Sequence, residues 1–241
     1  MTTFVLVPGF WLGAWAWEDV TRELRSAGHE VHPVTLPGLA DRAAEATPEV
    51  DLEAHIADLV RLLEDGDLRD VVLVGHSGAN APVTAVGDRC PERIARVVYV
   101  DAAPMPAGAS VLGFNPPEVQ EAWRKSVATD GDGWLLPLPD FGPEDLAGLD
   151  DEQLTRMRTK CTPQPFRTAA QSLQRPDPTP DVPRSVIATT FSPQDVQAMI
   201  DSGDPAFAVL AGVDLHHLPT GHWPMLSRPA DLAALLADIA G

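Results

Sequence analysis

Short apolar runs alternate with amphipathic segments along most of the chain, and this alternation limits the folds that it can adopt. Six runs predict strands, at residues 4–7, 31–36, 71–74, 97–100, 186–190 and 213–218. Several of them are apolar at every position, which is typical of parallel strands covered by helices on both faces. The pattern therefore predicts an α/β fold with a mainly parallel, doubly wound sheet of about six strands.

The segments between these runs carry apolar residues at helical spacing, which predicts helices that pack on the sheet. The three clearest stripes are formed by Trp17, Val20 and Leu24, by Leu52, Ile56, Leu59 and Leu63, and by Leu232, Leu235, Leu236 and Ile239. The first stripe closes at Gly28, and the last is entered through Ser227 and Pro229. Each position fits a helix that connects two parallel strands.

Residues 104–183 interrupt the alternation, because they show no strand signal and are rich in proline and glycine. Polar helical fragments are expected near residues 118–128, 150–160 and 165–173. An insertion between two parallel strands lies over the carboxyl edge of the sheet, where ligands bind. We therefore expect residues 1–241 to form a single domain whose 104–183 segment is a helical cap.

Composition excludes several function classes. The 241-residue chain has a formal net charge of −18, which disfavours binding to nucleic acid and to anionic membranes. Its two cysteines, Cys90 and Cys161, are too few for a disulfide framework and lack metal-ligand spacing, so we expect two thiols and no metal, although one bridge between them stays open. The first apolar run lacks a basic flank and is too short for a signal peptide, which predicts a cytoplasmic protein.

A serine follows the third apolar run directly, in the segment Gly75-His76-Ser77-Gly78-Ala79. A sharp turn from strand to helix at this point lifts the hydroxyl of Ser77 clear of the sheet, above the N-terminus of the next helix. The usual pattern is Gly-x-Ser-x-Gly, and Ala79 replaces its last glycine. Ser77 is therefore a candidate nucleophile.

His222 is the candidate general base, because it follows the last predicted strand and precedes the last helix. A serine hydroxyl is too weak an acid to ionise near neutral pH, so a nucleophilic serine needs a base at the same sheet edge. The other histidines are interpreted as structural: His29, His32 and His55 as surface residues, His216 and His217 as members of the last strand, and His76 as a neighbour of the serine turn.

The loop after the first strand, which begins Pro8-Gly9-Phe10-Trp11, can aim backbone N–H groups at the same place. We expect the N–H groups of Phe10 and Gly78 to form an oxyanion hole. Trp11 is the aromatic residue that we place in the substrate pocket.

These segments resemble the α/β-hydrolase superfamily, and in particular its small esterase-like branch, which includes plant methyl esterases and hydroxynitrile lyases. The matching segments are residues 6–9, 13–17, 75–79, 96–101, 162–165 and 218–224, in the family's order. The resemblance implies the α/β-hydrolase fold, with Ser77 as nucleophile, His222 as base and the cap roofing the pocket. Pro8 stands where the family often has histidine, which leaves the backbone donors in place.

A carboxylate must also orient the histidine and stabilise its charged form. Ser192 occupies the position where the family usually has this acid. Asp195, three residues later, is a candidate, although it also fits a helix-opening residue. Asp101 ends the strand at 97–100 at the same sheet edge, and we favour it. A dyad without a supporting acid is the third alternative.

The sequence therefore predicts a carboxylesterase-like serine hydrolase that cleaves a small ester through an acyl-enzyme on Ser77, without a cofactor. Its expected partner is a small-molecule substrate, with neither nucleic acid nor membrane. Two alternatives stay open, namely a lyase or cyclase on the same fold and a ligand-binding protein with a decayed triad. Substrate identity, and the choice between monomer and homodimer, are left open.

Overall fold

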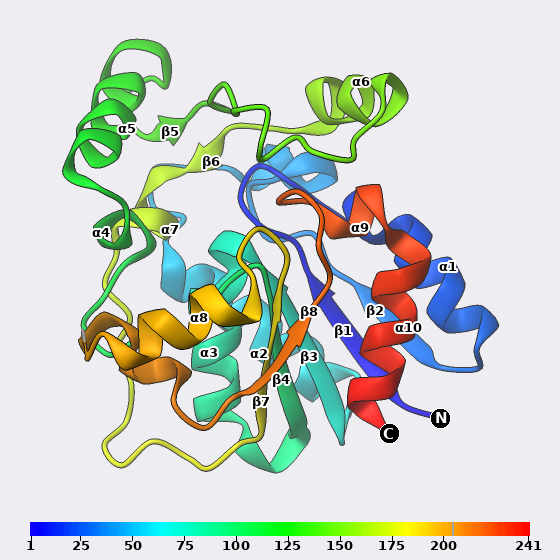
Figure 1. Ribbon diagram of the computed structural model, residues 1–241. Coiled ribbons are helices and arrows are strands. Elements are labelled where there is room, and N and C mark those ends of the chain that lie inside the picture. Colours follow the sequence, from blue (N-terminus) through cyan, green and yellow to red (C-terminus); the bar gives the residue numbers. More distant parts are fainter. Residues whose placement is uncertain (204) are drawn as a thin grey trace.

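The central element is one parallel sheet with strand order β2-β1-β3-β4-β7-β8 (Figure 1). The computed structural model describes residues 1–203 and 205–241. The six strands are β1 (Thr3–Val7), β2 (Glu30–Pro33), β3 (Val71–His76), β4 (Ile94–Val100), β7 (Arg184–Ala188) and β8 (Asp214–His217). All six overlap the predicted apolar runs, so the doubly wound parallel sheet is confirmed.

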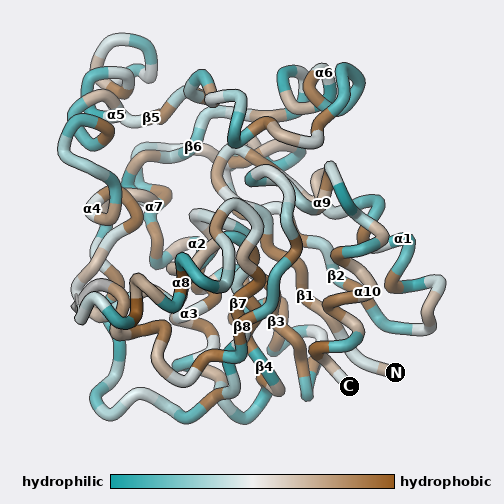
Figure 2. The backbone as a smooth tube through the Cα atoms, in the orientation of Figure 1, coloured by the Kyte–Doolittle hydropathy of each residue, from teal (hydrophilic) through white to brown (hydrophobic). Residues whose placement is uncertain are grey.

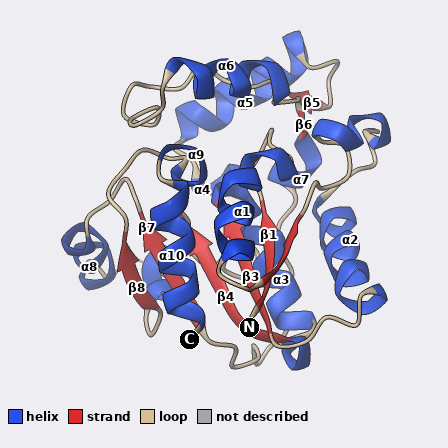
Figure 3. Cartoon of the chain, turned by 90° about the vertical axis from the view of Figure 1, so that its right-hand side faces the viewer, coloured by secondary structure: helices blue, strands red, loops and turns tan. Residues whose placement is uncertain are grey.

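Helices cover both faces of this sheet (Figures 1 and 3). On one face α1 (Glu18–Ser26) packs against α10 (Pro229–Ala240), and on the other α2 (Leu52–Asp65) packs against α3 (Asn80–Arg89). The side chains of β1 alternate between the two cores, so that the face towards α1 takes Phe4 while the face towards α2 takes Val5. Because both faces are buried, the strands must be apolar at every position.

The insertion between β4 and β7 passes over the carboxyl ends of the strands (Figure 1). It contains α4 (Val111–Phe114), α5 (Pro117–Asp130), β5 (Leu135–Leu136), α6 (Asp151–Lys160), β6 (Gln164–Pro165) and α7 (Phe166–Ala170). The expected helical fragments are confirmed, but the absence of strands is not. The strands β5 and β6 pair antiparallel over two residues each, too few to leave a periodic signal.

The remaining elements are short, apart from α8 (Pro193–Asp201) between β7 and β8. They are η1 (Ala14–Trp17), η2 (Ala40–Glu45), η3 (Ser77–Ala79), η4 (Pro91–Arg93), η5 (Pro205–Leu210) and α9 (Pro224–Ser227). Hydrophobic residues concentrate in the strands, whereas α5 and α6 are largely hydrophilic (Figure 2). Among the described residues, no helix combines the length and the apolarity that a membrane crossing needs.

Arg175 holds both ends of the insertion. Its guanidinium makes two hydrogen bonds to the buried carboxylate of Asp88 in α3, at 2.6 and 2.9 Å. It also donates to the carbonyl oxygen of Met105, where the insertion begins, at 3.1 Å. One side chain thus ties the start and the end of the insertion to the body of the fold. The two cysteines, Cys90 and Cys161, are free thiols, as expected.

Candidate active site

Ser77 lies on a strained turn between β3 and η3. Its φ is +49°, in a region that residues other than glycine rarely adopt. The two neighbouring glycines are required by space, because a Cβ on Gly75 would lie 2.6 Å from Val83 and one on Gly78 would lie 2.6 Å from the ring of Phe10. Ala79 has an ordinary helical φ of −74°, so a glycine is not needed there.

The structure brings together the three side chains that the sequence singled out. Ser77 Oγ lies 2.9 Å from Nε2 of His222, and Nδ1 of His222 lies 2.6 Å from Oδ2 of Asp101. A carboxylate only accepts hydrogen bonds, so the proton of the neutral imidazole is assigned to Nδ1. Nε2 is then free to accept the hydroxyl proton of Ser77, as a general base requires.

Asp101 is prepared to hold a negative charge. Besides His222, its carboxylate accepts hydrogen bonds from the backbone N–H groups of Thr189 and Thr190, each at 3.2 Å, and from Oγ1 of Thr190 at 3.1 Å. Burial alone raises the pKa of Asp101, but the hydrogen bond and charge of His222 and the two threonines outweigh it. The pKa of this carboxyl therefore lies well below its ordinary value.

Asp195, the other candidate acid, caps the helix to which it belongs. Its Oδ2 accepts hydrogen bonds from the backbone N–H of Ser192 at 2.9 Å and from Oγ of Ser192 at 2.6 Å, in a capping box that opens α8. The hydrogen bonds from Ser192 also lower the pKa of Asp195. Of the two carboxylates that the sequence left open, Asp101 is the one bonded to His222.

Phe10 and Gly78, the two expected oxyanion donors, lie against each other at the serine turn. The ring of Phe10 covers the Cα of Gly78 so closely that no side chain fits there. The N–H of Gly78 belongs to the first turn of a helix, where amide groups have no partner within the helix. Such groups favour a negative charge placed above them.

Trp11 is fixed between the serine turn and the cap. Its φ is +65°, its backbone N–H donates to Oε1 of Gln164 at 3.0 Å, and its indole N–H donates to the carbonyl oxygen of Leu136 at 3.0 Å. Gln164 is completely buried and also donates to Thr168. Residues 162–165 were among the segments that resemble the family, but the sequence gave Gln164 no role in holding this loop.

An aromatic cluster continues from Trp11 to the histidine. The ring of Trp11 lies 6.0 Å from that of Trp123 and 5.7 Å from that of Phe141, both in the cap. Phe141 lies 4.6 Å from Trp223, whose ring is 5.1 Å from that of His222. The cap is therefore in contact with the residue next to the candidate base.

The cap also holds the backbone of the His222 loop, which the sequence did not indicate. The N–H of His222 donates to the carbonyl oxygen of Asp145 at 2.9 Å, and the N–H of Gly221 donates to that of Ala147 at 3.2 Å. A Cβ on Gly221 would lie 2.5 Å from both of these oxygens. Glycine is thus the only residue that lets the cap approach this loop.

Two further histidines are buried, and one of them contacts the His222 loop. His76 is 1% exposed, and its Nε2 donates to the carbonyl oxygen of His222 at 2.7 Å. Burial, and after it the charge of His222, lower the pKa of His76 to about 3, so its ring is neutral. The interpretation of His55 as a surface residue was wrong: it is 2% exposed and bonded to the carbonyl oxygen of Pro37 at 3.0 Å. Its position in the apolar stripe of α2 was the available signal.

The described residues contain no group of three or more histidine, cysteine, aspartate or glutamate side chains arranged to hold a metal ion. The chemistry that this site offers is that of a serine hydroxyl, an imidazole and a carboxylate in series.

Comparison with known proteins defines the class. Residues 4–235 match the model of the alpha/beta hydrolase family, and the chain belongs to that family. A carbendazim hydrolyzing esterase from Nocardioides sp. (strain SG-4G) is 30% identical, covering 99% of this chain and all of the relative. Methylesterase 7 of Arabidopsis thaliana is also 30% identical, covering 98% of this chain and 95% of its own length.

Solved structures agree on the fold. An extracellular alpha/beta-hydrolase from a Paenibacillus species superposes with a TM-score of 0.85 at 23% identity, covering 100% of this chain and 99% of the other. The predicted class, an ester-cleaving and carboxylesterase-like α/β-fold hydrolase, is confirmed by these similarities. The lyase and the ligand-binding alternatives are not favoured.

Proposed function

We propose that the chain hydrolyses a small carboxylic ester through an acyl-enzyme on Ser77. The single observation that carries the proposal is the unbroken series from Ser77 Oγ through His222 to Asp101, with contacts of 2.9 and 2.6 Å. A missing acid was the reason to consider a decayed site. Because Asp101 contacts His222, a decayed site is no longer favoured.

In the first half of the reaction, Oγ of Ser77 attacks the ester carbonyl while Nε2 of His222 takes its proton. The carbonyl oxygen becomes negative and is held by the N–H groups of Phe10 and Gly78. Asp101 stabilises the imidazolium that forms. His222 then returns the proton to the alcohol oxygen, the carbon–oxygen bond breaks, and the alcohol leaves.

In the second half, His222 takes a proton from water, and the resulting nucleophile attacks the acyl carbon. The same two N–H groups hold the second oxyanion. When it collapses, the bond to Ser77 breaks, the serine recovers its proton from His222, and the carboxylic acid is released. No metal or cofactor takes part in these steps.

In this proposal residues 1–241 form one domain, residues 104–183 act as its cap, and Trp11 forms part of the pocket wall. Support for the cap comes from its hydrogen bonds to the His222 loop, which make it part of the frame that orients the base. The name of the Arabidopsis relative, a methylesterase, favours a methyl ester as substrate. The cytoplasmic location stays a prediction, to be tested by cell fractionation.

The test uses a fluorophosphonate probe, which phosphonylates an activated serine, together with hydrolysis of p-nitrophenyl acetate. The wild-type protein is expected to be labelled at Ser77 and to release p-nitrophenol in a burst. Ser77→Ala removes both, whereas the exposed control Ser26→Ala, whose hydroxyl bonds only to its own helix, changes neither. Labelling that persists in Ser77→Ala contradicts the assignment of the nucleophile.

A further inference from the structure

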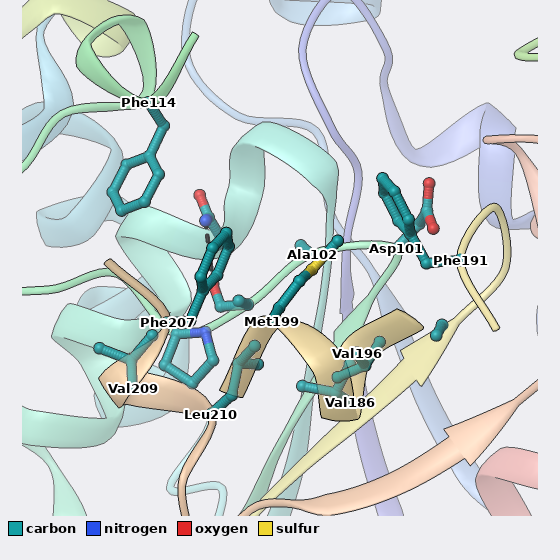
Figure 4. Close-up of a pocket in the computed structure, with 14 residues that line it drawn as sticks. Asp101, Ala102, Phe114, Val186, Phe191, Val196, Met199, Phe207, Val209 and Leu210 are labelled. Carbon is teal, nitrogen blue, oxygen red and sulfur yellow. Dashed lines mark hydrogen bonds between the residues drawn. The ribbon is translucent and has the colours of Figure 1, made fainter. Parts of the chain in front are cut away.

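A cavity of about 260 Å³ lies on the α3 side of the sheet, next to the candidate active site (Figure 4). Neither Ser77 nor His222 is among its lining residues. Its wall is formed by the start of the insertion after β4, by α8 and by η5, and the larger contributors are Phe114, Phe191, Val196, Met199, Phe207 and Leu210. Asn80 and Asp101 are the polar lining residues. The lining is therefore almost entirely apolar.

The opening of this cavity exposes aromatic surface. Among the large hydrophobic side chains of the described residues, three are exposed: Met1, Phe114 at 47% and Phe191 at 51%. Both phenylalanines line the cavity, and Figure 4 shows them on either side of Phe207 and Met199. Single exposed apolar residues scattered over a surface are ordinary, but exposed apolar side chains gathered at the opening of one cavity indicate a binding site.

The cavity begins one strand away from the nucleophile. His76 of β3 pairs with Val100 of β4, so the residues that follow, Ser77 and Asp101, lie side by side at the carboxyl edge. Neighbouring strands are about 4.8 Å apart. The carboxylate of Asp101 is already occupied by His222 and by the two threonines. The wall nearest to the reaction therefore offers a ligand mainly apolar surface.

Size and charge define what fits. An apolar cavity of about 150 Å³ is enough to bind benzene, so this one has room for a benzyl group or for a chain of about six carbons. None of its described lining residues is basic, and the chain carries a net charge of −18, so an anionic group is disfavoured. A cation is disfavoured too, because the apolar lining cannot replace its water and the carboxylate of Asp101 is already bonded to His222, so we infer an uncharged, apolar occupant.

We propose that this cavity binds the apolar group of the ester, on either the acyl or the alcohol side, and that it makes the protein prefer esters with a chain of about six carbons. The inference rests on the proposed function, because it assigns a subsite to that same reaction. Each buried methylene adds about fourfold to binding. If the cavity is used, a six-carbon ester gains at least about tenfold in kcat/KM over methyl acetate.

The experiment compares methyl acetate with methyl hexanoate and with hexyl acetate, by following proton release. Met199→Trp fills the cavity from α8, and Gln194→Trp places the same side chain on the exposed side of that helix. We expect Met199→Trp to lower kcat/KM at least tenfold for one long ester and at most twofold for methyl acetate. A loss with methyl hexanoate assigns the acyl side, and a loss with hexyl acetate assigns the alcohol side. Gln194→Trp keeps the wild-type preference.

If Met199→Trp fails to fold, Val209→Phe fills the same cavity from η5. The cavity assignment alone is overturned if the filled variant still turns over methyl acetate, is labelled at Ser77 by the fluorophosphonate, and keeps the wild-type preference for long esters. The same result follows if the wild-type protein shows no preference for either long ester. Absence of labelling and of all ester turnover in the wild-type protein overturns the proposed function instead.

Discussion

Replacing Asp101 by asparagine tests the assignment of the acid most directly, because the surroundings fix how the new amide must lie. Oδ1 of Asp101 accepts three hydrogen bonds, from the backbone N–H groups of Thr189 and Thr190 and from Oγ1 of Thr190. Only an oxygen satisfies these donors, so the amide nitrogen must take the place of Oδ2 and face Nδ1 of His222.

An N–H group facing Nδ1 selects the wrong tautomer of His222. Nδ1 becomes the acceptor and the proton moves to Nε2, which then points at Ser77 Oγ and cannot take the serine proton. The equivalent change in a Ser-His-Asp protease lowers turnover by about 10⁴-fold, which corresponds to about 5.5 kcal/mol in the activation free energy. We expect kcat for p-nitrophenyl acetate to fall by a similar factor.

The assay compares kcat in Asp101→Asn with kcat in Asp195→Asn, and thermal unfolding verifies that both variants are folded. Asp195→Asn weakens the cap of α8 and is expected to keep kcat within about twofold, because Asp195 is exposed and bonded to Ser192. The reasoning is refuted if folded Asp101→Asn keeps more than about a tenth of the wild-type kcat, or if Asp195→Asn loses as much as Asp101→Asn.

Three further predictions concern the frame around the site. Gly221→Ala drives the His222 loop away from the cap and lowers kcat by about 10²-fold, as a displacement of about 1 Å can; a kcat within twofold of wild type contradicts this. His55 has its pKa lowered to about 4, so the unfolded chain binds more protons between pH 4 and 6.5, and stability falls by up to about 3 kcal/mol as pH drops through that range. Urea unfolding in His55→Gln should show a flatter pH dependence, which the exposed control His217→Gln should not share. Arg175→Met leaves a buried carboxylate poorly paired and costs about 3 kcal/mol in urea unfolding, and a loss below about 1 kcal/mol is inconsistent with the proposed anchoring of the cap.

The sheet and the serine turn could be predicted because both depend on short stretches of sequence. A strand buried on both faces must be apolar at every position, which residues 71–74 record directly. The turn at Ser77 needs small neighbours, and Gly75 and Gly78 show this in the sequence. His222 was found in a similar way, because the order of strands places the loop after β8 at the same edge.

The sequence offered Asp101 and Asp195 as the acid and favoured Asp101 for its place at the sheet edge, but no local pattern could show which of the two contacts His222. Their difference lies in contacts between distant positions: Asp101 meets His222 across 121 positions of the chain. Three other features also depend on contacts between distant positions and were not predicted. They are the burial of His55, the two-residue pairing of β5 with β6, and the approach of Asp145 to Gly221.

The sequence by itself therefore determined which segments form the six-stranded sheet, where the candidate nucleophile Ser77 lies and which class of hydrolase the chain belongs to. Those properties depend on whether each residue is buried and on which backbone conformation its neighbours in sequence allow. Both produce a pattern in the local sequence. The tertiary structure alone showed that Asp101 contacts His222 and that the cap holds the backbone of the His222 loop. Those properties depend on the register and packing of chain segments far apart in sequence, which no local pattern records.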